Sequence, residues 1–314
     1  MATFLVTGCA GFIGSHLVEA LLARGDRVLG VDAFRDYYSR SIKELNIAGA
    51  RRSQNFELIE ADLEQLEYDA LADGLDGIFH LAAQPGVRGS WGETFALYAR
   101  DNVIVTQRIF GTATRATVRV VWASSSSVYG NAEAYPTAER TRPRPISPYG
   151  VTKLSCEQLA AAYLESFGLD HVALRYFTVY GPRQRPDMAF SRIGQALAER
   201  TVFPVYGTGN QTRDVTFVAD AVSATLAAME LAPPGSVYNI GGGSETSLND
   251  VIAVAERLTG LRLDVRREPA ASGDVRRTAA DITQAKAELA WRPETPLEQG
   301  LRAQLRAAGI PIQE

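Results

Sequence analysis

The fold is decided by residues 3–25, which read TFLVTGCAGFIGSHLVEALLARG. A short apolar run leads to Gly8, Gly11 and Gly14, and apolar residues then recur at helical spacing as far as Gly25. This order predicts a strand, a tight turn and a helix. Glycines at such a turn let a diphosphate approach the backbone, where the N–H groups at the helix start face the anion. The spacing is GxxGxxG rather than the usual GxGxxG, so a turn that only packs the helix against the strand stays the alternative.

Strand-like and helix-like patterns alternate through the first half of the chain. Helical stretches at 93–115 and 148–167 separate the later apolar runs, and the runs lie at 27–34, 56–63, 77–83, 119–130 and 171–181. Such alternation predicts a parallel sheet with helices on both faces and right-handed crossovers. We therefore expect an α/β protein built on a Rossmann-type doubly wound parallel sheet, with its ligand at the carboxyl ends of the strands.

The pattern changes after residue 181. A loop rich in proline and arginine leads to a helix at about 188–200, a strand is expected at 237–241, and Thr246 or Ser247 is a candidate N-cap. These features predict a smaller mixed α/β C-terminal domain that covers the first. The expected boundaries are 1–180, with 211–243 returning to it, for the first domain, and 181–210 with 244–314 for the second.

Composition narrows the class of protein. The 314 residues carry a net charge of −4 with both signs interspersed, so we expect no broad basic field for nucleic acid. No apolar run approaches the roughly 20 residues of a membrane span, and the start MATFLVTG lacks a charged leader, so neither a membrane segment nor a signal peptide is expected. Two cysteines make no disulfide framework, which favours a cytoplasmic location. The three histidines lack metal-ligand spacing, and no metal site is expected.

An acidic residue ends the second apolar run. Asp32 lies in VLGVDAF, where a carboxylate accepts both hydroxyls of an adenosine ribose and repels a 2′-phosphate. This favours NAD over NADP, although Arg35 is a counter-signal because an arginine can serve such a phosphate. Asp62 and Leu63 follow the third run and are expected near the adenine, and a helix N-cap is the equal alternative for Asp62.

A further pattern joins the fifth run to the helix after it. The run ends in WASSSSVYG, and Tyr149 and Lys153 stand one helical turn apart in the next helix. Tyrosine ordinarily has a pKa of about 10, and a neighbouring ammonium together with a cationic nicotinamide favours the phenolate. Among 32 basic residues only Lys43, Lys153 and Lys286 are lysines, and a compact ammonium suits this role better than a guanidinium. With a serine hydroxyl at the strand end, the pattern predicts acid–base catalysis beside a hydride acceptor.

In this order the motifs resemble the extended short-chain dehydrogenase/reductase family, which contains nucleotide-sugar epimerases and dehydratases. The resemblance covers nearly the whole chain and is carried by TGCAGFIG (7–14), Asp32, HLAA (80–83), SSSSVYG (124–130), YGVTK (149–153), RYFTVYGP (175–182) and GDVRRT (273–278). It implies that the first domain binds NAD and the second a UDP-sugar, with Ser125 as the catalytic hydroxyl, Tyr149 as acid/base and Lys153 as its partner. The implied NAD site consists of Gly8, Gly11, Phe12, Ile13, Gly14, Asp32, Asp62, Leu63, Leu81, Ala82, Ala83, Tyr149, Lys153 and Tyr176.

The residues after the catalytic hydroxyl divide this family by reaction. Dehydratases carry Asp and Glu there, whereas this chain has Ser126 and Ser127, and the glutamate usual in UDP-glucuronate decarboxylases is absent. The resemblance therefore implies a 4-epimerase. In such an enzyme Tyr149 takes the 4-hydroxyl proton while C4 of the sugar gives hydride to NAD, and a transient 4-keto sugar forms.

The choice of sugar rests on YGPRQRPDMAFSR (180–192) and HLAAQPGVRGSW (80–91), which resemble the group of UDP-glucuronic acid 4-epimerases. This implies UDP-glucuronic acid and UDP-galacturonic acid as the pair, with Arg185 as partner of the carboxylate; a phosphate contact or a salt bridge is the alternative for Arg185. Thr178 replaces the asparagine of the broader family, as in that group. The implied substrate set is Arg88 beside the sugar, Arg213 and Arg276 at the diphosphate, and Ser125, Ser126, Ser127, Thr178, Arg185, Met188 and Arg192.

Other functions stay open. A 4-epimerase of UDP-glucose or UDP-N-acetylglucosamine comes next, and a UDP-glucuronate decarboxylase third. A non-catalytic NAD-binding regulator belongs to a different class, but such proteins usually lose the tyrosine or the lysine that this chain keeps. The resemblance further implies a homodimer paired through the helices at 93–115 and 148–167.

Overall fold

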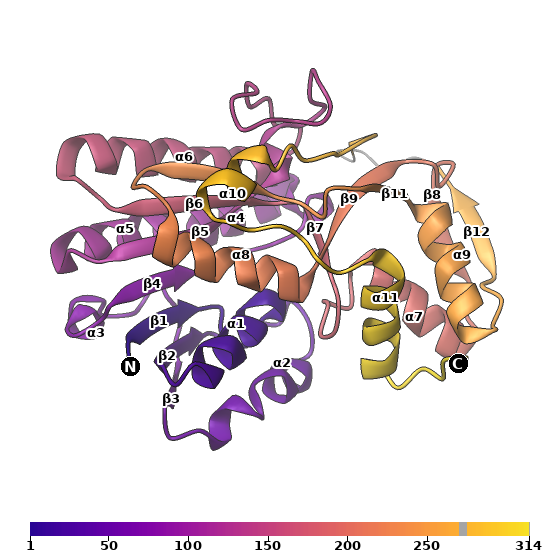
Figure 1. Ribbon diagram of the computed structural model, residues 1–314, viewed down its shortest axis with the longest axis horizontal. Helices are drawn as coiled ribbons and strands as arrows, with labels where there is room; N and C mark the ends of the chain where they lie inside the picture. The colour runs from indigo at the N-terminus through magenta and orange to yellow at the C-terminus, as the bar shows by residue number, and fades with distance from the viewer. Residues whose placement is uncertain (270–274, 314) are drawn as a thin grey trace.

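The computed structural model describes residues 1–269 and 275–313 (Figure 1). Its largest element is a seven-stranded sheet in the order β10-β6-β5-β4-β1-β2-β3, and each neighbouring pair of strands is parallel. The strand order runs outward from β1 in both directions, which is the mark of a doubly wound sheet. The predicted fold class is therefore confirmed. The strands of this main sheet are β1 (Thr3–Thr7), β2 (Arg27–Asp32), β3 (Phe56–Glu60), β4 (Gly77–His80), β5 (Arg119–Ser125), β6 (His171–Tyr176) and β10 (Ser236–Ile240).

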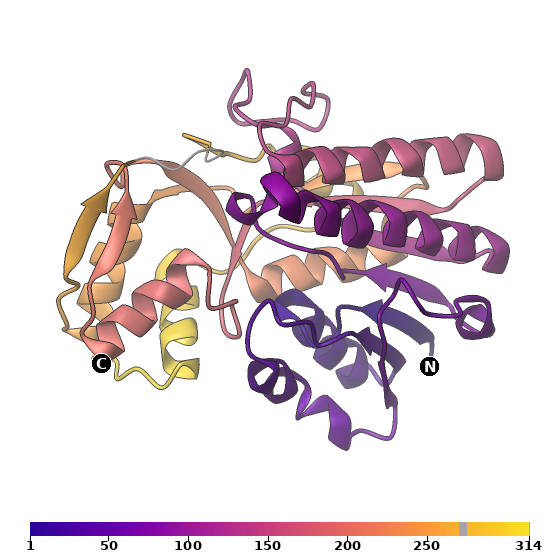
Figure 2. The same cartoon turned by 180° about the vertical axis from the view of Figure 1, so that it is seen from behind.

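Helices cover both faces of the main sheet. The principal ones are α1 (Phe12–Ala23), α5 (Val105–Ala116), α6 (Pro148–Phe167) and α8 (Val218–Leu231). Figures 1 and 2 show α5 and α6 on one side of the sheet and α1 and α8 on the other. Phe4 and Val6 of β1 pack in the core formed with α1 and α8, whereas Leu5 packs in the core formed with α5 and α6. Because successive side chains of a strand point to opposite faces, the unbroken apolar run of β1 fits a strand buried on both sides.

A further group of elements packs around a third apolar core, at the right of Figure 1. It contains a three-stranded sheet, a parallel strand pair and three helices. Within the stretch 211–243, β10 belongs to the main sheet and β9 belongs to the small three-stranded sheet. The predicted domain boundaries stay a prediction. The elements are β7 (Thr178–Tyr180), β9 (Thr212–Phe217), β11 (Glu245–Ser247), the pair β8 (Phe203–Tyr206) and β12 (Val265–Glu268), and the helices α7 (Ala189–Glu199), α9 (Leu248–Thr259) and α11 (Leu297–Ala307).

Two predicted strands end earlier than the sequence suggested. β5 ends at Ser125, because the side-chain oxygen of Ser125 accepts the N–H of Ser127 at 3.1 Å and starts a short 3₁₀ turn, Ser126–Val128. The predicted strand 171–181 breaks at Phe177, whose N–H donates to the carbonyl of Ile240 at 3.0 Å. Beyond this break β7 pairs with β9 instead, so the chain passes directly from the main sheet into the small one.

The helical stretch predicted at 93–115 is interrupted. It consists of a 3₁₀ turn (Gly92–Thr94), α4 (Phe95–Tyr98), a π-helical turn (Ala99–Ile104) and α5. Asn102 in the π turn is fully buried; its Oδ1 accepts the N–H of Gln84 at 2.7 Å, and its Nδ2 donates to the carbonyl of Gln84 at 3.2 Å. This contact with the loop after β4 explains a local departure from α-helix that the sequence did not reveal.

Capping at α9 follows the prediction. Ser247 is the N-cap, and it exchanges hydrogen bonds with Asp250 in a capping box. The sequence patterns did not single out several short helices and turns. They are α2 (Arg40–Ile47), α3 (Asp69–Ala72), α10 (Thr283–Glu288) and the 3₁₀ turns Ala50–Arg52 and Arg88–Ser90.

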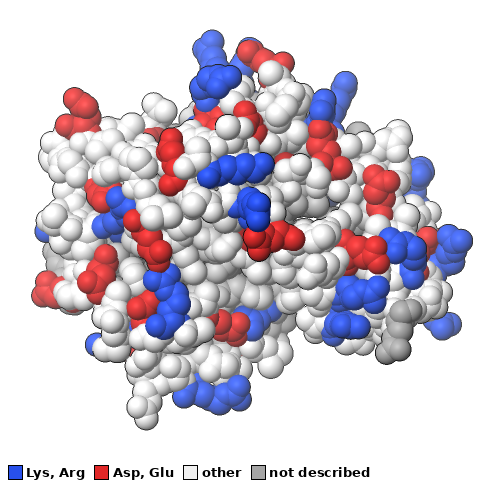
Figure 3. Space-filling view, viewed as in Figure 1, with Lys and Arg blue, Asp and Glu red and all other residues white. Residues whose placement is uncertain are grey.

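Charged side chains of both signs are interspersed over the face shown in Figure 3. Opposite charges pair at several places in the protein; Arg40 pairs with Glu60 at 2.7 Å, and Arg119 pairs with Asp170 at 3.0 Å. None of the helices in residues 1–269 and 275–313 has both the length and the apolar character needed to cross a membrane.

The buried imidazole of His171 should make stability depend on pH. It is 3% exposed at the start of β6, and neither ring nitrogen has a hydrogen-bond partner among the described residues. Burial lowers its pKa from 6.5 to about 4. Between pH 6.5 and about 4 the unfolded chain binds a proton that the folded chain does not bind. The free energy of unfolding therefore falls as the pH drops through this window, by about 3 kcal/mol in total.

The variant His171→Leu should lack this part of the acid sensitivity. Urea unfolding of both proteins at a series of pH values would measure it, because the difference in free energy of unfolding isolates the single group. Parallel curves for the two proteins across the window would show that His171 does not carry the effect.

Candidate active site

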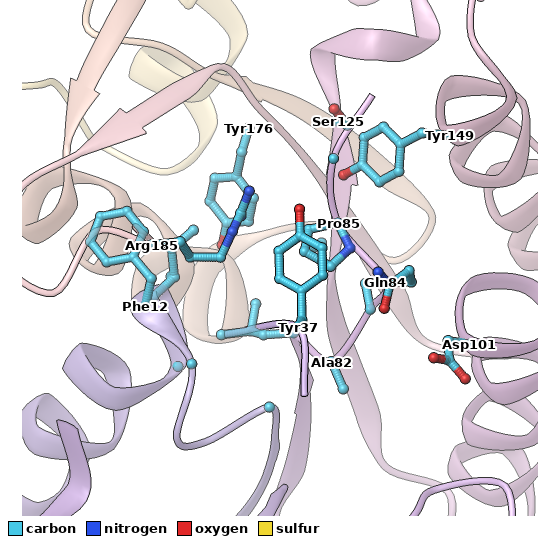
Figure 4. A pocket seen from close by; sticks show the side chains of 18 of the residues that line it. Phe12, Tyr37, Ala82, Gln84, Pro85, Asp101, Ser125, Tyr149, Tyr176 and Arg185 are labelled. Atoms are coloured by element: carbon cyan, nitrogen blue, oxygen red, sulfur yellow. The ribbon is translucent and has the colours of Figure 1, made fainter. Parts of the chain in front are cut away.

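A cavity of about 400 Å³ opens at the carboxyl ends of β1, β2, β4 and β5 (Figure 4). This volume lies within the range of about 300–1,000 Å³ usual for small-molecule sites. The wall combines the glycine turn after β1, the segments after β2, β4 and β5, the start of α6, and part of residues 176–188. Every residue of the predicted NAD set lines this cavity; that these residues bind NAD stays a prediction.

The glycine turn brings the start of α1 against the end of β1. Gly8 has a φ of +71°, in the region that favours glycine. A Cβ on Gly14 would lie 2.1 Å from the carbonyl oxygen of Gly8, so no other residue fits there without a shift of backbone. The first turn of α1 contains no acidic residue. Because the free N–H groups and the dipole of a helix start attract anions, this turn fits the diphosphate of a dinucleotide.

Asp32 holds the turn as well as facing the cavity. Its carboxylate accepts the N–H of Ala10 at 3.2 Å and the N–H of Phe34 at 2.8 Å. The ammonium of Lys43 lies 3.5 Å from Oδ1 of Asp32 and also lines the cavity. The sequence reasoning did not assign Lys43, although two of only three lysines, Lys43 and Lys153, prove to lie in this wall. The rarity of lysine was the signal that would have found it.

Arg35 is engaged by two carboxylates. Its Nη2 lies 2.5 Å from Oδ2 of Asp62 and 3.4 Å from Oδ1 of Asp101. Asp62 also accepts the N–H of Glu64 at 3.1 Å, so it closes a turn rather than capping a helix. Because two carboxylates offset its charge, Arg35 attracts a 2′-phosphate only weakly, which fits NAD rather than NADP.

The serine turn and the start of α6 are pressed together. A Cβ on Gly150 would lie 2.6 Å from the carbonyl oxygen of Ser127, so only glycine allows this approach. Ser147 caps the helix by accepting the N–H of Gly150 at 3.1 Å. Tyr149 is thereby held beside the serine turn, and Figure 4 shows Ser125 and Tyr149 at the same end of the cavity.

Lys153 is anchored to the strand that carries the serines. Its ammonium, 4% exposed as a residue, donates to the carbonyl of Ala123 at 2.8 Å. Burial, and then the charge of Lys153, lowers the pKa of the nearby His80 to about 3. His80 is therefore neutral, bonded to the hydroxyls of Thr7 and Thr106 at 2.7 and 3.0 Å, and adds no second positive charge here.

Part of the predicted substrate set lies in the same wall. Thr178 begins β7 directly after the break at Phe177, and Arg185 follows in the segment that leads to α7. The guanidinium of Arg185 lies 5.7 Å from the ring centroid of Tyr37. The predicted substrate residues that line the cavity are Ser125, Ser126, Ser127, Thr178, Arg185 and Met188.

The other predicted substrate arginines lie outside the described wall of the cavity. The guanidinium carbon of Arg88 lies 4.4 Å from the ring centroid of Tyr206, and that of Arg192 lies 5.5 Å from the ring centroid of Phe203. Such stacking on aromatic faces is a stabilising use of arginine that sequence alone does not separate from ligand binding. Their contact with substrate stays a prediction.

Arg213 and Arg276 also remain untested as diphosphate ligands. Arg213 donates from Nη1 to the carbonyl of Thr212 at 2.9 Å. The carbonyl of Arg276 accepts the N–H of Thr212 at 3.2 Å. Within the motif GDVRRT, Gly273 and Asp274 lie outside the described residues.

Several wall residues carried no assignment from the sequence. Tyr37 and Tyr38 follow β2 as a pair, and burial raises the pKa of each phenol to about 12, so both stay protonated as hydrogen-bond donors. Their place directly after the strand that ends in Asp32 was a weak signal for a ligand wall. Others of this kind are Gln84, Pro85, Gly86 and Asp101.

Comparisons with known proteins agree with this architecture. The sequence profile of the GDP-mannose 4,6 dehydratase family matches residues 5–304. A protein of Bacillus subtilis called an uncharacterized UDP-glucose epimerase, YtcB, is 41% identical over 95% of each chain. The UDP-glucuronic acid 4-epimerase of Bacillus cereus, crystallised with UDP-glucuronic acid and NAD, is 39% identical with a TM-score of 0.95, over 98% of this chain and 99% of that one.

A third relative was crystallised with two different sugars. MoeE5 is 43% identical over 98% of this chain and 99% of its own, with a TM-score of 0.88 for its complex with UDP-glucuronic acid and NAD. For its complex with UDP-glucose and NAD the TM-score is 0.89. The profile and these relatives span nearly the whole chain, so this protein belongs to the GDP-mannose 4,6 dehydratase family of extended short-chain dehydrogenase/reductase enzymes, and within it stands beside the nucleotide-sugar epimerases.

Proposed function

We propose that the protein is an NAD-dependent 4-epimerase of UDP-sugars and that it interconverts UDP-glucuronic acid and UDP-galacturonic acid. The observation that carries the proposal is a single cavity whose wall holds an anion-binding turn with Asp32, the group of Ser125, Tyr149 and Lys153, and Arg185. The similar Bacillus cereus enzyme, crystallised with UDP-glucuronic acid and NAD, supports both ligands.

The chain's own groups move the proton of the reaction. Tyr149 accepts the proton of the sugar 4-hydroxyl, and the buried ammonium of Lys153 lies in the same wall of the cavity. The oxygen of Ser125 already accepts the N–H of Ser127, so its own hydrogen is available to the sugar 4-oxygen. NAD held by the glycine turn and Asp32 would supply a reversible acceptor for the hydride of C4 of the sugar. Tyr149 then gives its proton back, and the sum is an isomerisation without net oxidation.

Removal of the phenol should abolish turnover while binding persists. We expect Tyr149→Phe to lower kcat by about 10²–10⁴-fold, the usual contribution of a positioned acid–base group. A titration with NAD, followed through the fluorescence of the protein, should give for this variant a dissociation constant close to that of the parent protein. The matched control is Tyr163→Phe on the same helix, whose hydroxyl bonds Gln107 outside the cavity and should not affect kcat. A kcat within about threefold of the parent for Tyr149→Phe would contradict the role.

Arg185 has a chemical task beyond recognition. Oxidation at C4 turns a glucuronate into a β-keto acid, which loses CO₂ when the C5–C6 bond aligns with the carbonyl π system. The guanidinium fork matches a carboxylate with two parallel hydrogen bonds, and such a clamp keeps that bond out of alignment. Arg185 therefore serves both to select the uronate and to prevent its decarboxylation.

The variant Arg185→Ala should convert UDP-glucuronate more slowly, by about 10²-fold in kcat/KM, and should release CO₂ with formation of a UDP-pentose. Chromatography of the products would measure both effects. Arg183→Ala is the control, because Arg183 pairs with Glu19 at 2.5 Å and does not line the cavity. Intact turnover without extra UDP-pentose in Arg185→Ala would refute the assignment.

A neutral UDP-hexose is the second candidate substrate. MoeE5, crystallised with UDP-glucose as well as UDP-glucuronic acid, and the Bacillus subtilis relative called a UDP-glucose epimerase support it. Incubation with UDP-glucuronate, UDP-glucose and UDP-N-acetylglucosamine, followed by separation of the products, tests the proposed function. We expect UDP-galacturonate to form with the highest kcat/KM. If the protein converts only the neutral sugars, its substrate is a UDP-hexose and not UDP-glucuronate.

We also propose a cytoplasmic homodimer. Phe95, Ile104 and Val151 are exposed by 39%, 48% and 45% on the stretches expected to pair, which supports burial of this face by a second copy. Cys9 and Cys156 are buried and unpaired, as suits a reducing compartment. Light scattering in solution should give the mass of two chains. A mass of one chain would contradict the dimer.

A further inference from the structure

The guanidinium expected to bind the sugar carboxylate is held by a carboxylate of its own chain. Nε of Arg185 donates to Oδ1 of Asp187 at 3.0 Å, and Nη2 donates to Oδ2 at 3.0 Å. This is the two-point geometry that a uronate would use. The side chain of Arg185 is 20% exposed and that of Asp187 is 42% exposed, so the pair lies at the edge of the cavity rather than within the core.

A tyrosine from the other side of the cavity completes the arrangement. The hydroxyl of Tyr37 donates to Oδ2 of Asp187 at 3.2 Å, and its ring lies under the guanidinium of Arg185. Tyr37 and Asp187 are 150 positions apart in the chain. The segment after β2 and the segment after β7 therefore meet through this group, and Figure 4 shows Tyr37 facing the cavity between Arg185 and Gln84.

We propose that Asp187 is a specificity-determining residue, an internal carboxylate that occupies Arg185 when the bound sugar is neutral and yields it to the carboxylate of a uronate. The inference rests on the proposed function, since it takes Arg185 as the partner of the sugar. Asp187 thereby sets how strongly the site prefers a charged sugar over a neutral one. It lets one cavity accept both, because neither sugar leaves Arg185 without a counter-charge.

The exchange of one carboxylate for another has a small net cost. A displaced Asp187 keeps the hydroxyl of Tyr37 as a donor and is exposed enough to be hydrated. A neutral sugar leaves the Arg185–Asp187 pair intact, whereas a uronate gains the fork of Arg185 only after it has broken that pair. The preference for the uronate is reduced by the strength of the internal pair, which is modest for an ion pair this exposed.

The test compares the affinities of two sugars in otherwise matched proteins. Dissociation constants for UDP-glucuronate and UDP-glucose are measured by calorimetry on the NAD-loaded protein, in the Tyr149→Phe background so that the sugar stays unreacted. Asp187→Asn keeps the shape and an acceptor for Tyr37 but frees Arg185. We expect the ratio of the two affinities to shift toward UDP-glucuronate by about threefold to fivefold. The control Glu19→Gln removes the partner of the neighbouring Arg183 and should not shift the ratio.

A second parent variant, Arg185→Ala, separates the effect of the Arg185–Asp187 pair from a general effect of charge. In the presence of Arg185→Ala, Asp187→Asn should change the ratio by less than about twofold, because Asp187 then has no guanidinium to occupy. An unchanged ratio in the first background, or an equal shift in both, would overturn the proposal. If the protein with Tyr149 intact converts no UDP-uronate at all, the proposed function itself fails and the inference falls with it. Turnover of UDP-glucuronate with an unchanged ratio would instead sink the inference alone.

Discussion

The carbonyl oxygen of Gly8 and the Cα of Gly14 approach so closely that no side chain fits between them. The start of α1 is fixed by this contact against the end of β1, an interior strand of the main sheet. Asp32 extends the constraint to β2, since its carboxylate bonds the N–H of Ala10 inside the same turn. The absence of a side chain at Gly14 thus lets the helix start, the turn and the carboxylate of Asp32 form one connected unit.

Prediction from sequence succeeded where the signal is local. The strand–turn–helix at the start, the spacing of Tyr149 and Lys153, and the cap at Ser247 each depend on neighbours within one turn of the chain. It failed where distant contacts decide. Nothing near Asn102 in the sequence announces the π turn, because the cause lies in the backbone of Gln84.

The same limit applies to the site. Ser125, Tyr149, Lys153 and Arg185 lie in one wall as the motifs suggested. The hydrogen bond between Tyr37 and Asp187 could not be predicted, because the two residues are 150 positions apart in the chain. Residue type alone does not distinguish a ligand contact from packing, so the contact of Arg88 with the substrate stays a prediction although its guanidinium stacks on Tyr206.

Two neighbouring serines at the end of β5 line the cavity, Ser124 and Ser125. The hydroxyl of Ser124 also donates to Glu157 at 2.6 Å. Glu157 in turn pairs with the buried Arg175 at 2.7 Å. Removal of either partner of such a buried pair leaves an uncompensated charge, so the pair holds the strand end firmly and with it the position of Ser125.

The break at Phe177 has a mechanical consequence. The chain crosses from one sheet to the other without a linker, and the N–H of Phe177 is tied to Ile240 in the main sheet. A second tie is the carboxylate of Asp214 on β9, which accepts the N–H groups of Gly242 and Ala280 at 2.5 and 2.9 Å. Displacement of β9 from the segment that follows β10 would break the bonds of Asp214, so these ties oppose a hinge motion between the two sheets.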